Sequence, residues 1–574
     1  MSRRPAAPPK AAVANRPAFA RAAAAGKRYA AATPATASAA APQPTTPATP
    51  DAPTPAKSVL YYGDNLDVLR RHIRDESVDL IYLDPPFNSN ANYNVLFEEH
   101  GEKAAAQVRA FEDTWEWNAD SRAAYEEMVE AGGRAADTMR AFRTMLGGTD
   151  MLAYLSMMAP RLVELRRVLK PTGSLYLHCD PTASHYLKLL LDAVYGPSNF
   201  QNEIIWYYKG AGVSPRRWGR RHDSILFYAN SKDWTFNVDP VRDPYAASTK
   251  ERFSHAIGNV RGGADYGQQQ LNPKGKHPDD VWEIPILAPS ARDRLGYPTQ
   301  KPLPLLERII AASSNPGDLV LDPFCGCGTT IDAAHGLGRR WIGVDITHLA
   351  VGLIKHRLVD RYGPEIAATY RVVGEPTSVD DAAVLAREDP FQFQAWALGL
   401  VGARLAGSAT KGGDKGIDGR LYFHDSAAGP TRQIVVSVKA GHLAPAYVRD
   451  LRGVLERERA EIGVLLSFEK PSAGMRAEAA EASFYESPWG RHPRIQLLTI
   501  GELLDGHGID YPHVTGANVT HRNADRAKPA QPYAPELFDV RLVAEEPAAY
   551  AAKPAGRVSR RPPARPEKGT SSAR

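Results

Sequence analysis

Short, unbroken apolar runs that alternate with segments of helical periodicity constrain the fold of this chain most strongly. Such runs are typical of strands buried on both faces of a parallel sheet, and the helices between them supply the crossovers. This pattern predicts an α/β, doubly wound domain followed by a second, smaller α/β unit at about 389–505. The expected strands are residues 59–62, 78–84, 173–178, 225–228, 319–322 and 341–345, and the expected helices are 151–169, 185–194 and 303–314.

Composition excludes several classes of protein. The 574 residues contain no apolar stretch near the ~18–20 residues that a bilayer span needs, so we expect no membrane association. Only three cysteines are present, which argues against a disulfide scaffold and for a reducing, cytoplasmic location. The absence of a CxxC pair also argues against structural zinc.

The net charge of +5 is no guide to a partner, because the excess of positive charge comes from two Ala/Pro-rich tails and the remainder of the chain is net acidic. We expect the tails, at 1–57 and 523–574, to be disordered, since they have too little apolar area to offset the entropy of ordering. Total charge therefore gives no argument for a nucleic-acid partner.

A glycine-rich turn follows the expected strand at 319–322, and the next strand ends in Asp345, about twenty residues after Gly326. Glycines at such a turn let a ligand approach the backbone, and the later acid can accept hydrogen bonds from ribose hydroxyls. Ile331 stands where a dinucleotide site has its third glycine, which favours a nucleoside cofactor such as S-adenosylmethionine. An ordinary glycine turn and a metal pair of Cys325 and Cys327 remain alternatives.

The expected strand at 78–83 ends in Asp84-Pro85-Pro86-Phe87. The two prolines stiffen the chain just past the carboxyl end of a strand, where α/β proteins form ligand sites. The Asp84 carboxylate and the Pro85 carbonyl can accept both hydrogens of an exocyclic amine, which frees the nitrogen lone pair for attack. Phe87 can stack on a flipped-out base. An aspartate that caps a helix in a proline-terminated loop is the alternative.

Together these motifs resemble the DNA amino-methyltransferases that methylate adenine N6 or cytosine N4. Their order, with the Asp-Pro-Pro-Phe motif first, resembles the beta class, and the likeness covers about 58–370. It implies a Rossmann-like fold and S-adenosylmethionine as cofactor. By this resemblance, Asp84, Pro85, Pro86 and Phe87 are catalytic, and the cofactor-binding residues are Asp64, Thr299, Lys301, Asp322, Phe324, Gly326, Gly328, Thr329 and Asp345.

Asp-Pro-Pro-Phe resembles the adenine enzymes, whereas N4-cytosine members often have Ser in place of Asp, so we favour adenine N6. By its position in the family order, 231–295 is expected to recognise the target sequence, and residues 88–97 to close over the flipped base. A basic and aromatic segment suits phosphate contact and filling of the gap left by that base, although a solvated loop explains it equally well. Its residues are Arg216, Arg217, Trp218, Arg220 and Arg221.

A third pattern pairs Asp418, which begins an expected strand, with Lys439 at the end of the strand 433–439. A carboxylate that holds Mg2+ and a nearby ammonium suit phosphodiester hydrolysis. The segment 389–505 resembles Mrr-like restriction endonucleases of the PD-(D/E)xK group, with helices expected at 396–406 and 447–461. Ser437 departs from that pattern, where the family has Glu or Gln, so an inactive or DNA-binding module is the alternative; Gln392 or Gln394 could compensate.

The leading hypothesis is therefore a site-specific, adenine-N6 DNA methyltransferase of the bacterial cytoplasm and nucleoid, fused to a restriction-endonuclease-like domain. Its cofactors would be S-adenosylmethionine and, for an active nuclease, Mg2+. Its partner would be double-stranded DNA, with a homodimer left open. An N4-cytosine enzyme with a non-cleaving module, an RNA or small-molecule methyltransferase, and a non-catalytic scaffold are the alternatives.

Overall fold

The computed structural model describes residues 57–86, 116–209, 216, 218–253, 270–288, 291, 294–295, 297, 299–406, 416–425 and 430–512, and the backbone of four short strands at 97–99, 102–104, 258–261 and 264–268. Phe87, Arg217, most of 88–97 and the predicted tails, apart from residue 57, lie outside these residues. In the described part of the chain no helix is both long enough and apolar enough to cross a bilayer.

A nine-stranded sheet forms the larger α/β body, in the order β10-β6-β7-β5-β2-β11-β12-β1-β13. Most of its pairings are parallel, as the apolar runs predicted, but β7 runs antiparallel to both β5 and β6. The expectation of a parallel strand at 225–228 was therefore wrong, because periodicity reports burial and not strand direction. The strands are β1 (Ser58–Tyr62), β2 (Val78–Leu83), β5 (Leu169–Cys179), β6 (Phe200–Tyr207), β7 (His222–Ala229), β10 (Val281–Glu283), β11 (Leu319–Asp322), β12 (Arg340–Asp345) and β13 (Tyr370–Val373).

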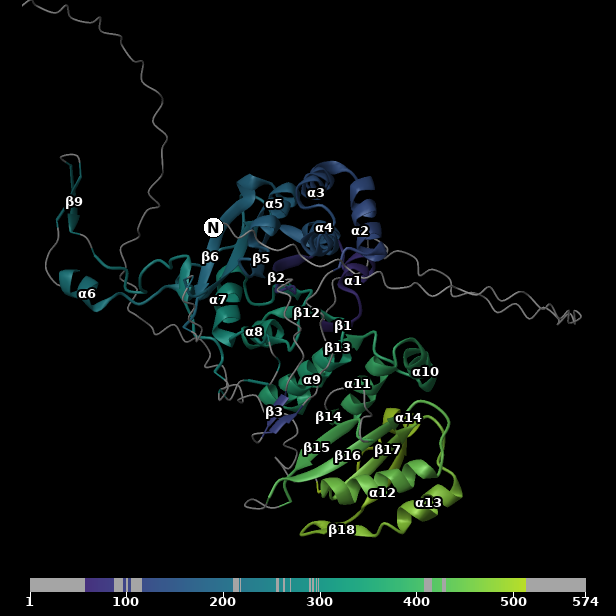
Figure 1. Cartoon of the computed structure of the whole chain (residues 1–574). Helices are drawn as coiled ribbons and strands as arrows, with labels where there is room; N and C mark the ends of the chain where they lie inside the picture. The colour runs from purple at the N-terminus through teal and green to yellow at the C-terminus, as the bar shows by residue number, and fades with distance from the viewer. Residues whose placement is uncertain are drawn as a thin grey trace, which may run out of the picture. The chain divides into compact units, whose positions relative to one another are not determined.

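Helices cover both faces of this sheet (Figure 1). Strand residues alternate between the faces, so that Leu80 and Tyr82 enter one hydrophobic core while Ile81 and Leu83 enter the other. The first face carries α7 (Leu303–Ser313), α8 (Thr329–Gly336) and α9 (His348–Tyr362), and the second carries α1 (Asn65–His72), α2 (Ala119–Glu130), α3 (Gly133–Leu146), α4 (Asp150–Val168) and α5 (Ser184–Tyr195).

Shorter elements connect or decorate this body. Two hairpins pair β3 with β4 and β8 with β9. These elements are β3 (Phe97–Glu99), β4 (Glu102–Ala104), β8 (Gly258–Arg261), β9 (Ala264–Gln268), α6 (Ala247–Phe253) and the 3-10 turns η1 (Pro197–Asn199), η2 (Asp239–Val241) and η3 (Pro364–Ala368).

A second sheet of five strands, in the order β14-β15-β16-β17-β20, forms the core of the following α/β unit. The alternation along β16 places Ile434 and Val436 in one core and Val435 in the opposite core. The strands are β14 (Arg404–Leu405), β15 (Gly419–Phe423), β16 (Arg432–Lys439), β17 (Ile462–Ser467) and β20 (Ile495–Thr499), with β18 (Phe484–Ser487) and β19 (Gly490–Pro493) as a hairpin.

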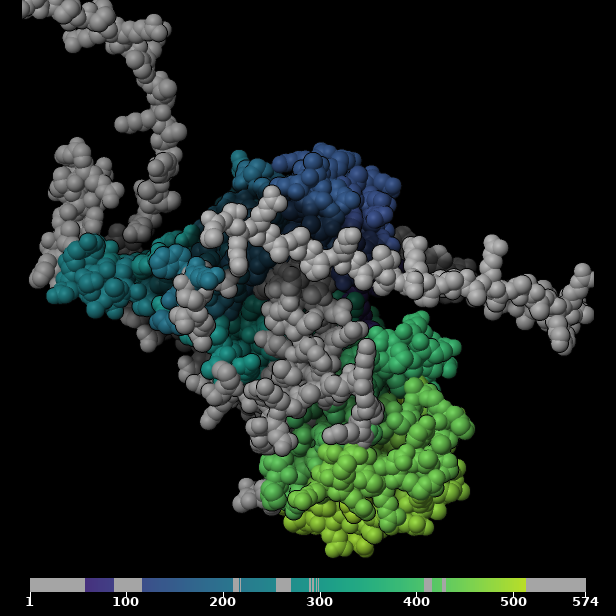
Figure 2. Space-filling model, viewed as in Figure 1, coloured from purple at the N-terminus to yellow at the C-terminus, as the bar shows by residue number. Residues whose placement is uncertain are grey.

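Helices α10 (Val379–Glu388), α11 (Pro390–Leu400) and α14 (Ile500–Leu504) cover one face of the second sheet, and α12 (Ala446–Glu458) and α13 (Ala473–Ala480) cover the other. The helix expected at 396–406 was misplaced: α11 starts at Pro390 because Asp389 caps its N-terminus, and Arg404–Leu405 form a strand. In Figure 2 these elements, green to yellow, form a continuously filled surface on the face in view.

Candidate active site

The carboxyl ends of four neighbouring parallel strands bring the predicted motifs to one edge of the large sheet. Along the sheet, β2 ends before Asp84, β11 ends at Asp322, β12 ends at Asp345, and β1 ends before Asp64. In α/β proteins ligands bind at this edge of the sheet. Residues that are far apart in the sequence therefore lie at one edge of the sheet.

The turn between β11 and α8 requires glycine at two positions. Gly326 and Gly328 have φ values of 49° and 78°, in the left-handed region. A Cβ atom on Gly328 would lie 2.7 Å from the Ile354 side chain, and one on Gly326 would lie 3.3 Å from the Tyr297 ring. Glycine at these positions therefore lets the turn adopt its left-handed conformation and pack closely against Ile354 and Tyr297.

Asp345 anchors this turn. Its Oδ2 accepts a hydrogen bond from the Gly326 N–H at 3.0 Å, and its Oδ1 accepts from the Thr347 N–H and hydroxyl. Burial raises the pKa of Asp345 to about 6 although these bonds lower it, and burial raises the pKa of Asp322 to about 7. The lone pairs that remain on Asp345 can accept ribose hydroxyls, so the site fits the nucleoside cofactor that the sequence predicted.

A buried ion-pair cluster, which the sequence analysis missed, supports the same turn from α9. Arg357 donates to the Cys327 carbonyl and to the Thr329 hydroxyl, and forms an ion pair with Asp332 at 3.0 Å. Asp332 also pairs with Arg361 at 2.9 Å. The sequence did contain a signal for this cluster. Arg357 and Arg361 are spaced i, i+4 on one helix, and Asp332 lies in the helix that follows the turn. Cys327, occupied by this packing, belongs to no cluster of three metal-ligating side chains among the described residues.

Asp64 lies at the end of β1 but is already engaged by the protein. It caps α1 through the Leu66 N–H, and Arg161 from α4 pairs with its carboxylate at 2.7 Å. Arg161 also donates to Asn65, whose amide donates to the Pro323 carbonyl at 2.7 Å. Asn65 and Arg161, which carry no sequence motif of their own, therefore tie the end of β1 to the turn after β11.

Asp84 forms an ion pair with Lys301 through its Oδ2, at 2.5 Å. Its Oδ1 is buried and has no hydrogen-bond partner among the described residues. Pro85 is buried and Pro86 is half-buried beside it. Asp84 thus offers one carboxylate oxygen as an acceptor, as an exocyclic amine requires.

A buried chain of polar side chains lies behind the Asp84 strand. The Tyr82 hydroxyl contacts Nδ1 of His178 at 2.9 Å, and Nε2 of His178 contacts the Asp223 carboxylate at 3.2 Å. The Tyr208 hydroxyl donates to the other Asp223 oxygen. Burial raises the pKa of Asp223, but the His178 hydrogen bond and the charges of His178 and Lys301 bring that pKa below its usual value. Sequence patterns gave no indication of this network.

The predicted DNA-contacting segment is solvent-exposed where it is described. Arg216 and Arg220 are exposed, Arg221 is half-buried, and Trp218 is 95% exposed. Thr299 is exposed as well, although Lys301 in the same segment is mostly buried against Asp84. An exposed tryptophan among arginines is consistent with a nucleic-acid contact.

In the second unit, Asp418 and Lys439 come together as predicted, with Lys439 Nζ 3.8 Å from the carboxylate. Asp418 is buried, and its oxygens accept hydrogen bonds from the Gln394 amide, the Ser437 hydroxyl and the Val438 N–H. Gln394, rather than Gln392, is therefore the residue that α11 brings to this position. No cluster of three metal-ligating side chains occurs among the described residues.

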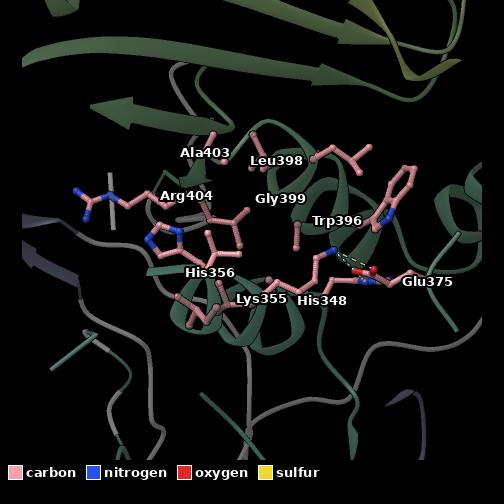
Figure 3. Close-up of a pocket in the computed structure, with 17 residues that line it drawn as sticks. His348, Lys355, His356, Glu375, Trp396, Leu398, Gly399, Ala403 and Arg404 are labelled. Atoms are coloured by element: carbon pink, nitrogen blue, oxygen red, sulfur yellow. Dashed lines mark hydrogen bonds and ion pairs between the residues drawn. The ribbon is translucent and has the colours of Figure 1, made fainter. Parts of the chain in front are cut away.

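A cavity of about 260 Å³ lies between α9 and the segment from α11 to β14 (Figure 3). Lys355 pairs with Glu375 on its wall, and Trp396 and Leu398 line it from α11. His348, also on the wall, is buried, stacks on Tyr62 at 3.6 Å between ring centroids, and has no hydrogen-bond partner for either ring nitrogen among the described residues. The cavity contains no residue of the Asp84 motif or the glycine turn.

Comparison with known proteins agrees with this geometry. Residues 78–356 match the family model for N6/N4 methyltransferases, described as DNA methylase. Residues 391–505 match the model for NACHT-associated inactive restriction endonuclease 1, which leaves the Mrr-like assignment unconfirmed and gives Mg2+ no support.

Two curated proteins are similar to the first of these regions. The type II methyltransferase M.HpaI of Haemophilus parainfluenzae is 32% identical over 232 residues, 40% of this chain and 68% of that protein. The DNA adenine methyltransferase YhdJ of Escherichia coli (strain K12) is 29% identical over 316 residues, 54% of this chain and 86% of that protein. Among solved structures, a putative DNA modification methylase of Thermus thermophilus, in complex with S-adenosyl-L-methionine, has a TM-score of 0.30 and 19% identity, and the match covers 55% of this chain and 100% of that one. From its matched motifs and its similarity to M.HpaI, this chain belongs to the N6/N4 family of DNA methylases.

Proposed function

We propose that this protein transfers a methyl group from S-adenosylmethionine to N6 of a flipped-out adenine in double-stranded DNA. The observation that carries the proposal is Oδ1 of Asp84, which has no hydrogen-bond partner among the described residues and lies at the strand end next to the glycine turn. Family membership supports the reaction class, and the adenine methyltransferase YhdJ supports the choice of base.

The chemistry follows from what the side chains can accept. An exocyclic amine is conjugated with its base and is a poor nucleophile. If Asp84 Oδ1 and the Pro85 carbonyl accept its two hydrogens, the nitrogen moves toward sp3 geometry and its lone pair becomes available. The cofactor, when bound, supplies an electrophilic methyl group, and Asp345 with the Gly326–Gly328 backbone would hold its nucleoside part.

For the second unit we propose a module that does not cleave DNA. Asp418 already accepts three hydrogen bonds and Ser437 is a weak ligand for Mg2+, which prefers carboxylate oxygens. The match to an inactive restriction-endonuclease family supports this assignment. The module would serve the methyltransferase as a DNA-binding or partner-binding domain.

The test incubates wild type, Asp84→Ala and Asp137→Ala with methyl-labelled S-adenosylmethionine and unmethylated DNA, and separates the nucleosides by mass spectrometry. Asp137, on the exposed side of α3, serves as the control. We expect N6-methyladenine from wild type and the control, and a loss of at least about 100-fold in Asp84→Ala with cofactor binding retained. Label in N4-methylcytosine would overturn the choice of base, and label only in RNA would overturn DNA as the substrate.

A further inference from the structure

Lys301 belongs to the segment that the sequence analysis assigned to the cofactor, but its ammonium group contacts Asp84. The Nζ to Oδ2 distance is 2.5 Å, and the two side chains are only 12% and 15% exposed. A charge pair that is this shielded from water interacts far more strongly than one on the surface. Lys301 therefore acts first on the carboxylate that we propose to be catalytic.

The pairing leaves the two oxygens of Asp84 in different states. Oδ2 is held by the ammonium, whereas Oδ1 is buried and has no partner among the described residues. A carboxylate held by one oxygen cannot turn freely about its last bond. Oδ1 is thus held where it meets no donor from the described residues, which is the state an acceptor for a substrate amine needs.

The charge of Lys301 also lowers the pKa of a second carboxylate, that of Asp223, which is hydrogen-bonded to His178 and Tyr208. His178 is completely buried and contacts Tyr82 on β2, two residues before Asp84. A network of polar side chains therefore lies behind the strand that carries Asp84.

We propose that Lys301 is the positioning residue for Asp84, holding its Oδ2 so that Oδ1 remains available to the target amine. This inference rests on the proposed function, in that it assigns Lys301 a part in the methyl-transfer reaction. The ion pair itself can be tested without any methyl transfer.

The first measurement compares Lys301→Met and Lys301→Arg with wild type. Lys188→Met is the control, because Lys188 forms a partly buried ion pair with Asp192 on α5, away from Asp84. We expect Lys301→Met to lower kcat by about 100-fold, since a misplaced catalytic group has an effect of that size. The Kd for S-adenosylmethionine by calorimetry and the KM for DNA should stay within about threefold of wild type, which assigns the loss to the chemical step.

Lys301→Arg keeps the positive charge and should recover at least about tenfold of the lost kcat. A weaker cofactor Kd with unchanged kcat in Lys301→Met would overturn the proposal and return Lys301 to the cofactor site. An unchanged kcat and Kd would overturn it as well.

The second measurement is a double-mutant cycle on thermal unfolding with Lys301→Met, Asp84→Asn and the double variant. Each single change removes the ion pair, and the double variant loses that pair only once, so its loss in Tm should be smaller than the sum of the two single losses by roughly 3–6 °C. Additive losses would overturn the pairing and the proposal with it. If the losses in Tm are coupled but wild type methylates no DNA, the ion pair is supported and the proposed function is rejected.

Discussion

At the scale of single residues, His348 shows how burial decides a protonation state. Its imidazole is buried at the start of α9, and burial together with the charge of Lys355 lowers its pKa to about 3. Glu375 lies 4.0 Å from Nδ1, too far to form a hydrogen bond that would offset the desolvation. His348 is therefore neutral at the pH of the cell.

The pH dependence of stability follows from the difference between the pKa of His348 in the folded chain, about 3, and the ordinary value of about 6.5 in the unfolded chain. Between about pH 6.5 and 3 the unfolded chain binds a proton at His348 that the folded chain does not, so the folded state loses stability as pH falls. From pH 7.5 to 5.0 this residue should cost about 2 kcal/mol. We expect His348→Phe, which keeps the stack on Tyr62, to reduce the loss seen in urea unfolding by about that amount.

The control for this prediction is His185→Phe, because His185 is exposed on α5. That variant should keep the acid sensitivity of wild type. If His348→Phe loses stability between the two pH values as steeply as wild type does, the imidazole is not held neutral by burial.

At the scale of elements, the turn from β11 into α8 and the helix α9 form one unit. Gly328 has φ 78° and packs on Ile354 of α9, and Arg357 of α9 holds the Cys327 carbonyl. The cofactor turn therefore keeps its shape through contacts with a helix that follows the next strand. A change in this packing should therefore weaken cofactor binding more than DNA binding.

We expect Gly328→Ala to weaken S-adenosylmethionine binding at least about tenfold and to destabilise the fold by roughly 1–3 kcal/mol, because the new Cβ meets both an unfavourable φ and the Ile354 side chain. Calorimetry and urea unfolding measure the two effects. Gly352→Ala, inside α9 with open space around its Cβ, should be neutral or stabilising by about 0.5–1 kcal/mol. Equal effects of the two variants would contradict this account of the turn.

At the scale of the whole molecule, two α/β units with separate hydrophobic cores carry different chemistry. The large sheet collects Asp84, Asp322 and Asp345 at one edge, whereas the small sheet encloses Asp418 in hydrogen bonds. Partly buried contacts still join the units, as where Gln392 of α11 accepts a hydrogen bond from the His348 N–H. The proposed methylation site therefore contains none of the groups around Asp418.

We expect Asp418→Ala to destabilise the second unit by about 1–3 kcal/mol, because it removes the acceptor for the hydrogen bonds donated by Gln394, Ser437 and Val438. Methylation should stay at the wild-type rate, and neither wild type nor the variant should nick plasmid DNA in the presence of Mg2+. Asp450→Ala, on the exposed side of α12, is the control for stability. Mg2+-dependent nicking by wild type that disappears in Asp418→Ala would show that the nuclease site is active.

Elements that depend on local patterns can be predicted from the amino-acid sequence. The strand at 319–322 and the helix from 303 follow from apolar runs and periodicity, and the motifs at Asp84 and Gly326 follow from residues that are adjacent in the chain. The common edge of the sheet was predictable too, because parallel strands place their carboxyl ends together. The departure from the nuclease pattern at Ser437 was predictable as well, because β-strand alternation places Ser437 on the same face as Lys439.

Contacts between groups that are far apart in the chain could not be predicted and are seen only in the folded protein. The Lys301–Asp84 pair, the Arg161 contact with Asp64 and the network of His178 join strands and helices that lie far apart in the chain. No local period encodes such contacts, because they depend on strand order and on the antiparallel direction of β7. Their strength depends on burial, which removes the water that would otherwise screen the charges, and burial is a property of the packed molecule.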